Sequence, residues 1–185
     1  MRRSLLLIPF LLLAACGSPE PAETDAGSGA TPGGCQDRPG ITYRTDAHLQ
    51  FLRADGTPIE EIAVEIVDTD STIQRGLMDR RCIPDDWGML FVFPDVQPRT
   101  FYMANTPRSL DIMFFGPDST FLNAAKYAEP LSPEVLPSEG PARFVVETPA
   151  GFVDRYGLVA GDRITWSSAE APADSVRTDT VRVES

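Results

Sequence analysis

The sequence is poor in the residue types that most often carry out catalysis. His48 is the only histidine, Lys126 is the only lysine, and three cysteines occur among the 185 residues. A Ser-His-Asp or Cys-His arrangement would therefore have to use His48, which lies in the first predicted strand and outside the motifs described below. We expect no catalytic residue, no metal site and no cofactor.

Positive charge is also scarce. The chain has 16 Lys and Arg residues against 27 Asp and Glu residues, which gives a formal net charge of -11 at pH 7. Phosphate backbones and anionic lipid head groups repel such a chain. We therefore expect no nucleic-acid partner.

The apolar run near the N-terminus is too short to be a membrane-spanning helix. It occupies residues 5–13 and follows Arg2 and Arg3, which is the arrangement of a secretory signal peptide. Residues 13–16 read Leu-Ala-Ala-Cys and resemble a bacterial lipobox. We expect residues 1–15 to be a lipoprotein signal peptide and Cys16 to carry the lipid; an ordinary signal with an incidental cysteine is the alternative.

Composition divides the remaining chain into three parts. Residues 16–40 are rich in Gly, Ser, Pro, Ala and Thr and are predicted to form a flexible tether. Residues 41–167 contain the predicted domain, and residues 168–185 are either a polar C-terminal tail or a late edge strand. The predicted location is the cell envelope, as a membrane-anchored lipoprotein that faces the periplasm or the exterior and uses the Cys16 lipid to bind the membrane.

Two cysteines remain once Cys16 is assigned to the lipid. Cys35 and Cys82 form an even pair in a compartment where disulfides persist. A bridge between them would close a loop of roughly 50 residues and stabilise the domain by about 3 to 4 kcal/mol in the chain-entropy model. Two buried free thiols are the alternative.

Short apolar or alternating runs separated by turn residues predict a mainly β domain. One short helix is predicted with Asp70 or Ser71 as its capping residue, and a second is predicted to begin at Pro149 and to end at Gly157. The proline-rich residues 130–141 are predicted to be irregular. Because no βαβ spacing is present, we expect a compact closed barrel or sandwich with one or two short helices. The predicted strands are residues 47–52, 59–67, 89–93, 100–103, 110–115, 121–127, 142–147 and 163–166.

Several motifs in a fixed order resemble a known family. They are Arg-Gly-Leu-Met at 75–78, Gly-Met-Leu-Phe-Val-Phe at 88–93, Met-Ala-Asn-Thr at 103–106, Leu-Asp-Ile at 110–112, Val-Glu at 146–147 and Gly-Asp at 161–162. Their order and approximate spacing are similar to those of domain-of-unknown-function family 192 of bacteria and archaea. The resemblance covers residues 62–166. It implies a compact, mainly β domain that is often exported and whose biochemical role is not established.

The candidate ligand-binding residues are polar side chains set beside apolar strands: Arg75, Asn105, Thr106, Asp111 and Glu147. If they converge, they form a small acidic pocket suited to a cationic or polyhydroxylated ligand. The alternative is that they hold turns and accept backbone or arginine donors.

The function predicted from these observations is that of a non-catalytic binding or accessory module anchored in the envelope, with an envelope protein as a further candidate partner. One alternative is a glycan-acting hydrolase that uses Asp111 and Glu147 as paired carboxylates. The other is a purely structural envelope lipoprotein.

Overall fold

A computed structural model describes residues 37–169 of the chain. Its helices are α1 (Asp70–Arg75) and α2 (Phe152–Tyr156), and neither they nor any other described helix is long and apolar enough to cross a membrane. The predicted signal peptide, Cys16, Cys35 and most of the predicted tether and tail lie outside the described residues. The strands are β1 (Ala47–Leu52), β2 (Pro58–Val67), β3 (Trp87–Phe101), β4 (Leu110–Phe115), β5 (Phe121–Ala128), β6 (Leu136–Pro149) and β7 (Arg163–Ser168).

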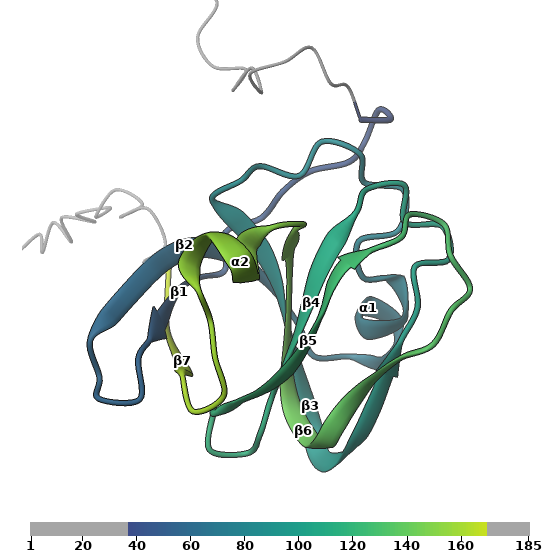
Figure 1. Ribbon diagram of the computed structural model, residues 1–185. Coiled ribbons are helices and arrows are strands. Elements are labelled where there is room, and N and C mark those ends of the chain that lie inside the picture. The colour runs from purple at the N-terminus through teal and green to yellow at the C-terminus, as the bar shows by residue number, and fades with distance from the viewer. Residues whose placement is uncertain (1–36, 170–185) are drawn as a thin grey trace, which may run out of the picture. The chain divides into compact units, whose positions relative to one another are not determined.

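The strands form one sheet in the order β5-β4-β6-β3-β2-β1-β7. Only β2 and β3 run parallel among these neighbours, and the α1 region connects them. The two ends of the sheet meet at one corner, where Phe121 N–H donates to the Asp162 carbonyl at 2.7 Å and Ile164 N–H donates to the Ser119 carbonyl at 3.1 Å. The sheet is therefore a curled half-barrel, and the prediction of a mainly β fold with short helices is confirmed (Figure 1).

Apolar side chains cover both faces of this sheet. One cluster includes Phe51, Met113 and Val146 and is covered by Phe152 of α2. The second lies on the other face, where Phe91, Ile112, Phe114 and Val145 pack under Leu77, which follows α1. The two helices thus cover opposite faces of the central strands, as Figure 1 shows. This burial on both faces is why β4 is apolar at five of its six positions.

Two predicted strands merge into longer ones. The predicted strand 89–93 and the first two residues of the predicted strand 100–103 are parts of β3, because residues 94–98 continue the strand with shifts in register opposite β6. Residues 102 and 103 lie beyond its end. Pro94 lies within the first of these register shifts, and Pro98 is paired with Pro141, which likewise has no N–H to donate. The second half of the proline-rich segment is also strand, since β6 begins at Leu136. The expectation of an irregular segment was wrong there.

The helix ends differ slightly from those predicted. Thr69, one residue before Asp70, caps α1: its hydroxyl accepts from Thr72 N–H, and its own N–H donates to the Thr72 hydroxyl at 3.1 Å. Helix α2 begins at Phe152, after the left-handed Gly151, whereas Pro149 closes β6. Gly157 ends α2 as predicted.

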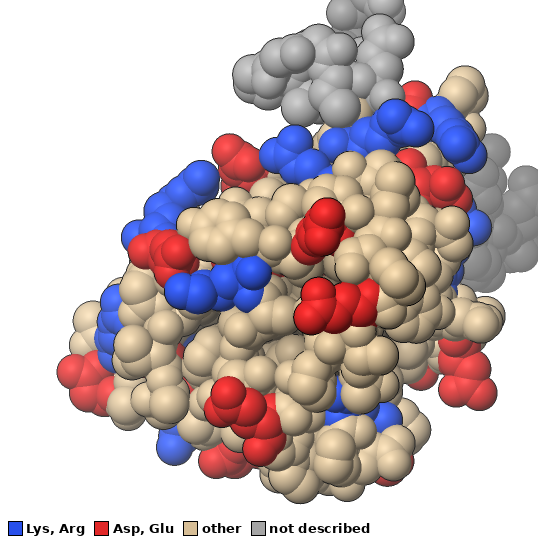
Figure 2. Space-filling model, turned by 45° about the vertical axis from the view of Figure 1, so that its right-hand side comes forward, with Lys and Arg blue, Asp and Glu red and all other residues tan. Residues whose placement is uncertain are grey.

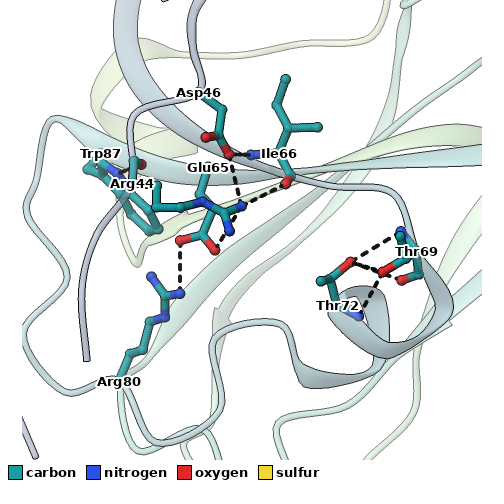
Figure 3. Close-up of polar contacts among 8 residues, drawn as sticks. All are labelled: Arg44, Asp46, Glu65, Ile66, Thr69, Thr72, Arg80 and Trp87. Carbon is teal, nitrogen blue, oxygen red and sulfur yellow. Dashed lines mark hydrogen bonds and ion pairs between the residues drawn. The ribbon is translucent and has the colours of Figure 1, made fainter. Parts of the chain in front are cut away.

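A network of ion pairs and hydrogen bonds holds the residues before β1 against the sheet (Figure 3). The carboxylate of Glu65 pairs with Arg80 at 2.8 Å and with Arg44 at 3.4 Å. The Trp87 indole N–H donates to the Arg44 carbonyl at 2.9 Å, and the Arg80 guanidinium lies over the rings of Tyr43 and Trp87. This network fixes the point at which the N-terminal part of the chain enters the domain.

Candidate functional site

A pocket of about 360 Å³ opens on the α1 side of the sheet, a size within the range of roughly 300 to 1,000 Å³ that is common for small-ligand sites. We call it the α1 pocket. Its wall on one side is the end of α1 with the turn that follows, and on the other side it is β3. On the face turned toward the viewer in Figure 2, acidic and basic side chains are scattered among uncharged ones. The lining residues are 73–78, Phe91, Phe93, 97–102, Thr106 and Glu147.

Glu147 supplies the only carboxyl group among these lining residues. It lies in β6 opposite Met89 of β3 and Ile112 of β4, and its side chain therefore rises from the middle of the sheet on the α1 side. The residue is 6% exposed, and its Oε2 atom has no hydrogen-bond partner within the described structure. Burial raises the pKa of this carboxyl to about 8, because removal from water penalises the charged form.

Gly76 brings the chain close to this carboxyl. It ends α1 with a φ of 46°, a value at which a residue without a side chain is favoured. A Cβ atom added here would lie 3.3 Å from the Phe91 ring and 3.8 Å from Oε2 of Glu147. The glycine therefore leaves room beside the carboxyl that any other residue would reduce.

Two arginines line the pocket, and they differ in burial and in pairing. Arg99 is buried; its guanidinium lies 3.9 Å from the centre of the Phe93 ring and pairs with Asp95 at 2.5 Å. The guanidinium of Arg75 is exposed and makes no hydrogen bond or ion pair with another described residue. It forms no hydrogen bond or ion pair with Asp111 or Glu147. Arg75 is thus free to meet a ligand at the rim.

Asp111 belongs to the other face of the sheet. Its register partner is Thr148, the neighbour of Glu147, so the two carboxyl groups point to opposite sides. The Asp111 carboxylate accepts backbone N–H groups from Tyr127 at 2.8 Å, Gly151 at 3.1 Å and Val153 at 2.9 Å. It holds the start of α2 and the end of β5, as the structural alternative predicted. The structure does not bring Asp111 and Glu147 together as an acid-base pair.

Asn105 and Thr106 form a turn next to the pocket. Asn105 has a φ of 62°, and its carbonyl accepts from the backbone of Asp79 at 2.8 Å. Thr106 is buried, lines the pocket, and its carbonyl accepts from Leu131 N–H at 3.0 Å. Backbone groups, not the Asn105 side chain, hold this turn in the described structure. Of the predicted residues, the fold brings Arg75, Thr106 and Glu147 to one pocket.

The pocket combines one buried acid with an aromatic and aliphatic wall and with uncharged polar side chains, among them Gln74, Gln97 and Thr100. The lining residues include no Ser, Cys, His, Lys or Asp, and within residues 37–169 no group of three or more His, Cys, Asp or Glu side chains could hold a metal ion. A single carboxyl without a second acid or base is suited to holding a ligand by hydrogen bonds.

The aromatic wall was missed by sequence reasoning. Phe91, Phe93 and Phe101 were interpreted only as strand residues, yet all three line the pocket, and Phe91 meets Phe101 edge to face at 5.1 Å. The period-two spacing of Phe91 and Phe93 indicates a shared face. What the spacing does not give is that Glu147 lies on that same face, because this depends on the register between β3 and β6.

Of the three cysteines in the predicted lipid and disulfide sites, the structure describes Cys82. Cys82 is buried and disulfide-bonded, but Cys35, the predicted partner, lies outside the described residues, as does Cys16. The pairing and the lipidation both stay predictions.

Comparison with known proteins identifies relatives over most of the chain. The sequence model of domain-of-unknown-function family 192, DUF192, described as "Uncharacterized ACR", matches residues 51–166. A Sinorhizobium meliloti protein described as a candidate transcription regulator is similar at 32% identity and a TM-score of 0.64, covering 69% of this chain and 98% of that one. A Novosphingobium aromaticivorans protein of unknown function is similar at 30% identity and a TM-score of 0.62, covering 74% and 95%. No curated protein matches the chain.

Proposed function

This chain belongs to DUF192, a family without an established biochemical role, and we propose that it is a non-catalytic module that binds a small molecule at the bacterial cell envelope. The observation that carries the proposal is the buried, unpaired carboxyl of Glu147 beside the α1 pocket. A buried polar atom without a partner costs free energy. A ligand that supplies the missing partner recovers that free energy as affinity.

The placement at the envelope rests on the sequence. Arg2, Arg3 and the apolar residues 5–13 precede the Leu-Ala-Ala-Cys box, and a lipid on Cys16 would hold the domain at a membrane surface. Such a position suits capture of a small molecule or presentation of it to an envelope partner.

Two other functions receive less support. Because Asp111 and Glu147 point to opposite faces of the sheet, paired-carboxylate hydrolysis of glycans lacks its second group. The Sinorhizobium meliloti relative is described as a candidate transcription regulator. We do not extend that role to this chain, because its net charge of -11 opposes binding to nucleic acid.

Binding of small aromatic fragments to the full chain in lipid nanodiscs tests the proposal. Thermal shift and ligand-observed NMR should detect fragments that bind the wild type and Asp111→Asn but lose affinity for Gly76→Ala. The alanine methyl group would occupy the space beside Glu147, whereas Asp111 lies on the other face. Fragments that bind all three proteins equally, or none of them, would favour the structural-lipoprotein alternative.

A further inference from the structure

The pocket presents one carboxyl group that no cation neutralises. The charged and titratable groups facing Glu147 around the pocket are Arg75 from the end of α1, and Arg99 and Tyr102 from β3 and its end. The Arg99 guanidinium is already paired with Asp95 and stacked on Phe93. None of the three forms an ion pair or hydrogen bond with Glu147 within the described residues.

A buried carboxyl without a counter-charge is stable in its neutral form, because the charged form loses its hydration. The pKa of Glu147, raised to about 8 by burial, agrees with this geometry. A neutral carboxyl offers an O–H donor and a carbonyl acceptor side by side. The complementary ligand group carries an acceptor and a donor at the same spacing, as an amide does.

One part of the pocket wall suits an apolar ligand body. Phe91, Phe93, Phe101 and Leu77 line the space around the carboxyl, and aromatic rings pack favourably against a flat apolar ligand. A cationic ligand would have to ionise Glu147 and approach two arginines.

Building on the proposed binding function, we propose that the α1 pocket takes an uncharged small molecule with an apolar, ring-sized body and an amide head group. The amide carbonyl accepts from the Glu147 carboxyl O–H, and the amide N–H donates to its carbonyl oxygen. The ligand class thus differs from the cationic or polyhydroxylated one that the sequence suggested.

Three probes that share a phenyl ring test the head group: benzamide, N,N-dimethylbenzamide, which lacks the N–H donor, and benzylamine, which is cationic at neutral pH. Each is titrated by NMR into the full chain in nanodiscs as wild type, Glu147→Gln and Gly76→Ala. The glutamine side chain keeps an adjacent donor and acceptor in nearly the same shape but does not titrate.

We expect benzamide to bind the wild type more tightly than either other probe and to bind Glu147→Gln within about threefold of the wild type, since the donor-acceptor pair is kept. Wild-type affinity for benzamide should fall about tenfold between about pH 7 and about pH 9 as the carboxyl ionises, and the affinity of Glu147→Gln should not change. Gly76→Ala should weaken binding of every probe.

Each of the other possible results would contradict a different part of the proposal. Tighter binding of benzylamine that is lost in Glu147→Gln would overturn the amide head group while the binding function stands. Equal binding of benzamide and its dimethyl derivative would overturn the paired hydrogen bonds. Binding of no probe to the wild type, or binding that Gly76→Ala leaves unchanged, would overturn both this inference and the proposed use of the pocket.

Discussion

Two buried carboxyl groups on neighbouring strands have opposite surroundings. Asp111 accepts three backbone N–H groups, so its burial is compensated and its role is to hold the fold. Glu147 makes no hydrogen bond through Oε2 and lies beside an open pocket. The contrast is what separates a structural acid from a candidate ligand-binding acid in this domain.

The raised pKa of Glu147 predicts how stability depends on pH. The folded protein keeps a proton on this carboxyl up to about pH 8, whereas an ordinary glutamate releases it near 4.5. The stability gained from keeping this carboxyl protonated is therefore fully present below about pH 4.5. It is lost as the pH rises from about 4.5 to about 8. Glu147→Gln should be more stable than the wild type by about 3 kcal/mol near pH 7 and equal to it near pH 4.

Urea unfolding at both pH values measures this difference, with the exposed Glu139→Gln as the matched control. An equal effect of Glu147→Gln at both pH values would show that the carboxyl is not neutral in the folded protein.

Asp111→Asn should destabilise the domain at neutral pH. Asparagine has one acceptor oxygen in place of two, and its NH₂ group would face a backbone donor, so at least one buried N–H loses its partner. We expect a loss of about 2 to 4 kcal/mol in the free energy of unfolding. Chemical unfolding checks this, with Asp118→Asn in an exposed turn as the control. A loss no larger than that of the control would contradict the assigned role.

At the scale of elements, strand periodicity was sufficient to locate most of the sheet. The bounds of β1 and β4 were predicted to the residue, since their apolar runs end at turn residues. Register was not predictable, because pairing between β4 and β6 is set by contacts distant in sequence. That register puts Asp111 and Glu147 on opposite faces, which is why the predicted acid pair and the observed pocket differ.

Proline and glycine explain the other differences. Proline at 94 and 98 suggested that a strand stops, but bulges let β3 continue through them. Proline at 149 suggested the start of a helix, but the left-handed Gly151 delays α2. In β3, pairing with β6 outweighed the preference of proline to end a strand. Before α2, the chain reversal after β6 outweighed the preference of proline to begin a helix.

Gly88 sets how closely β3 and β6 approach. A Cβ atom there would lie 2.8 Å from the Glu147 carbonyl oxygen and 3.0 Å from Ile62, and the oxygen belongs to a paired strand that cannot move freely. Gly88→Ala should therefore lose about 1 to 3 kcal/mol of stability through overpacking.

The matched control is Gly140→Ala, where the nearest atom, in Leu122, lies at 3.9 Å, and the effect should stay within about 0.5 kcal/mol. Thermal unfolding compares the two variants. Similar unfolding midpoints for the two variants would mean that the close approach of β3 and β6 does not require a residue without a side chain at position 88.

At the scale of the whole molecule, the fold gives the N-terminal side of the chain a firm attachment. The Glu65 network holds Arg44 against the sheet, and the Asp37 carboxylate accepts the backbone N–H of Arg81 at 2.5 Å and of Cys82 at 3.2 Å. These contacts lie on the path between the predicted lipid at Cys16 and the domain. A force or constraint applied through the N-terminal residues therefore reaches the sheet at β2 and at the segment after α1.

The predicted lipid on Cys16 would be the attachment of this domain to a membrane. A diacylglycerol group and an N-acyl chain together bury many methylene groups, each contributing about 0.8 kcal/mol, so anchoring is stable where a single chain is marginal. Cys16→Ala should abolish incorporation of labelled palmitate and release the protein from the membrane fraction, whereas Cys35→Ser should retain both. Label that persists in Cys16→Ala would rule out this anchor, and release without any label in the wild type would indicate an ordinary cleaved signal peptide. Retained benzamide binding in the released protein would then show that the α1 pocket works independently of the membrane.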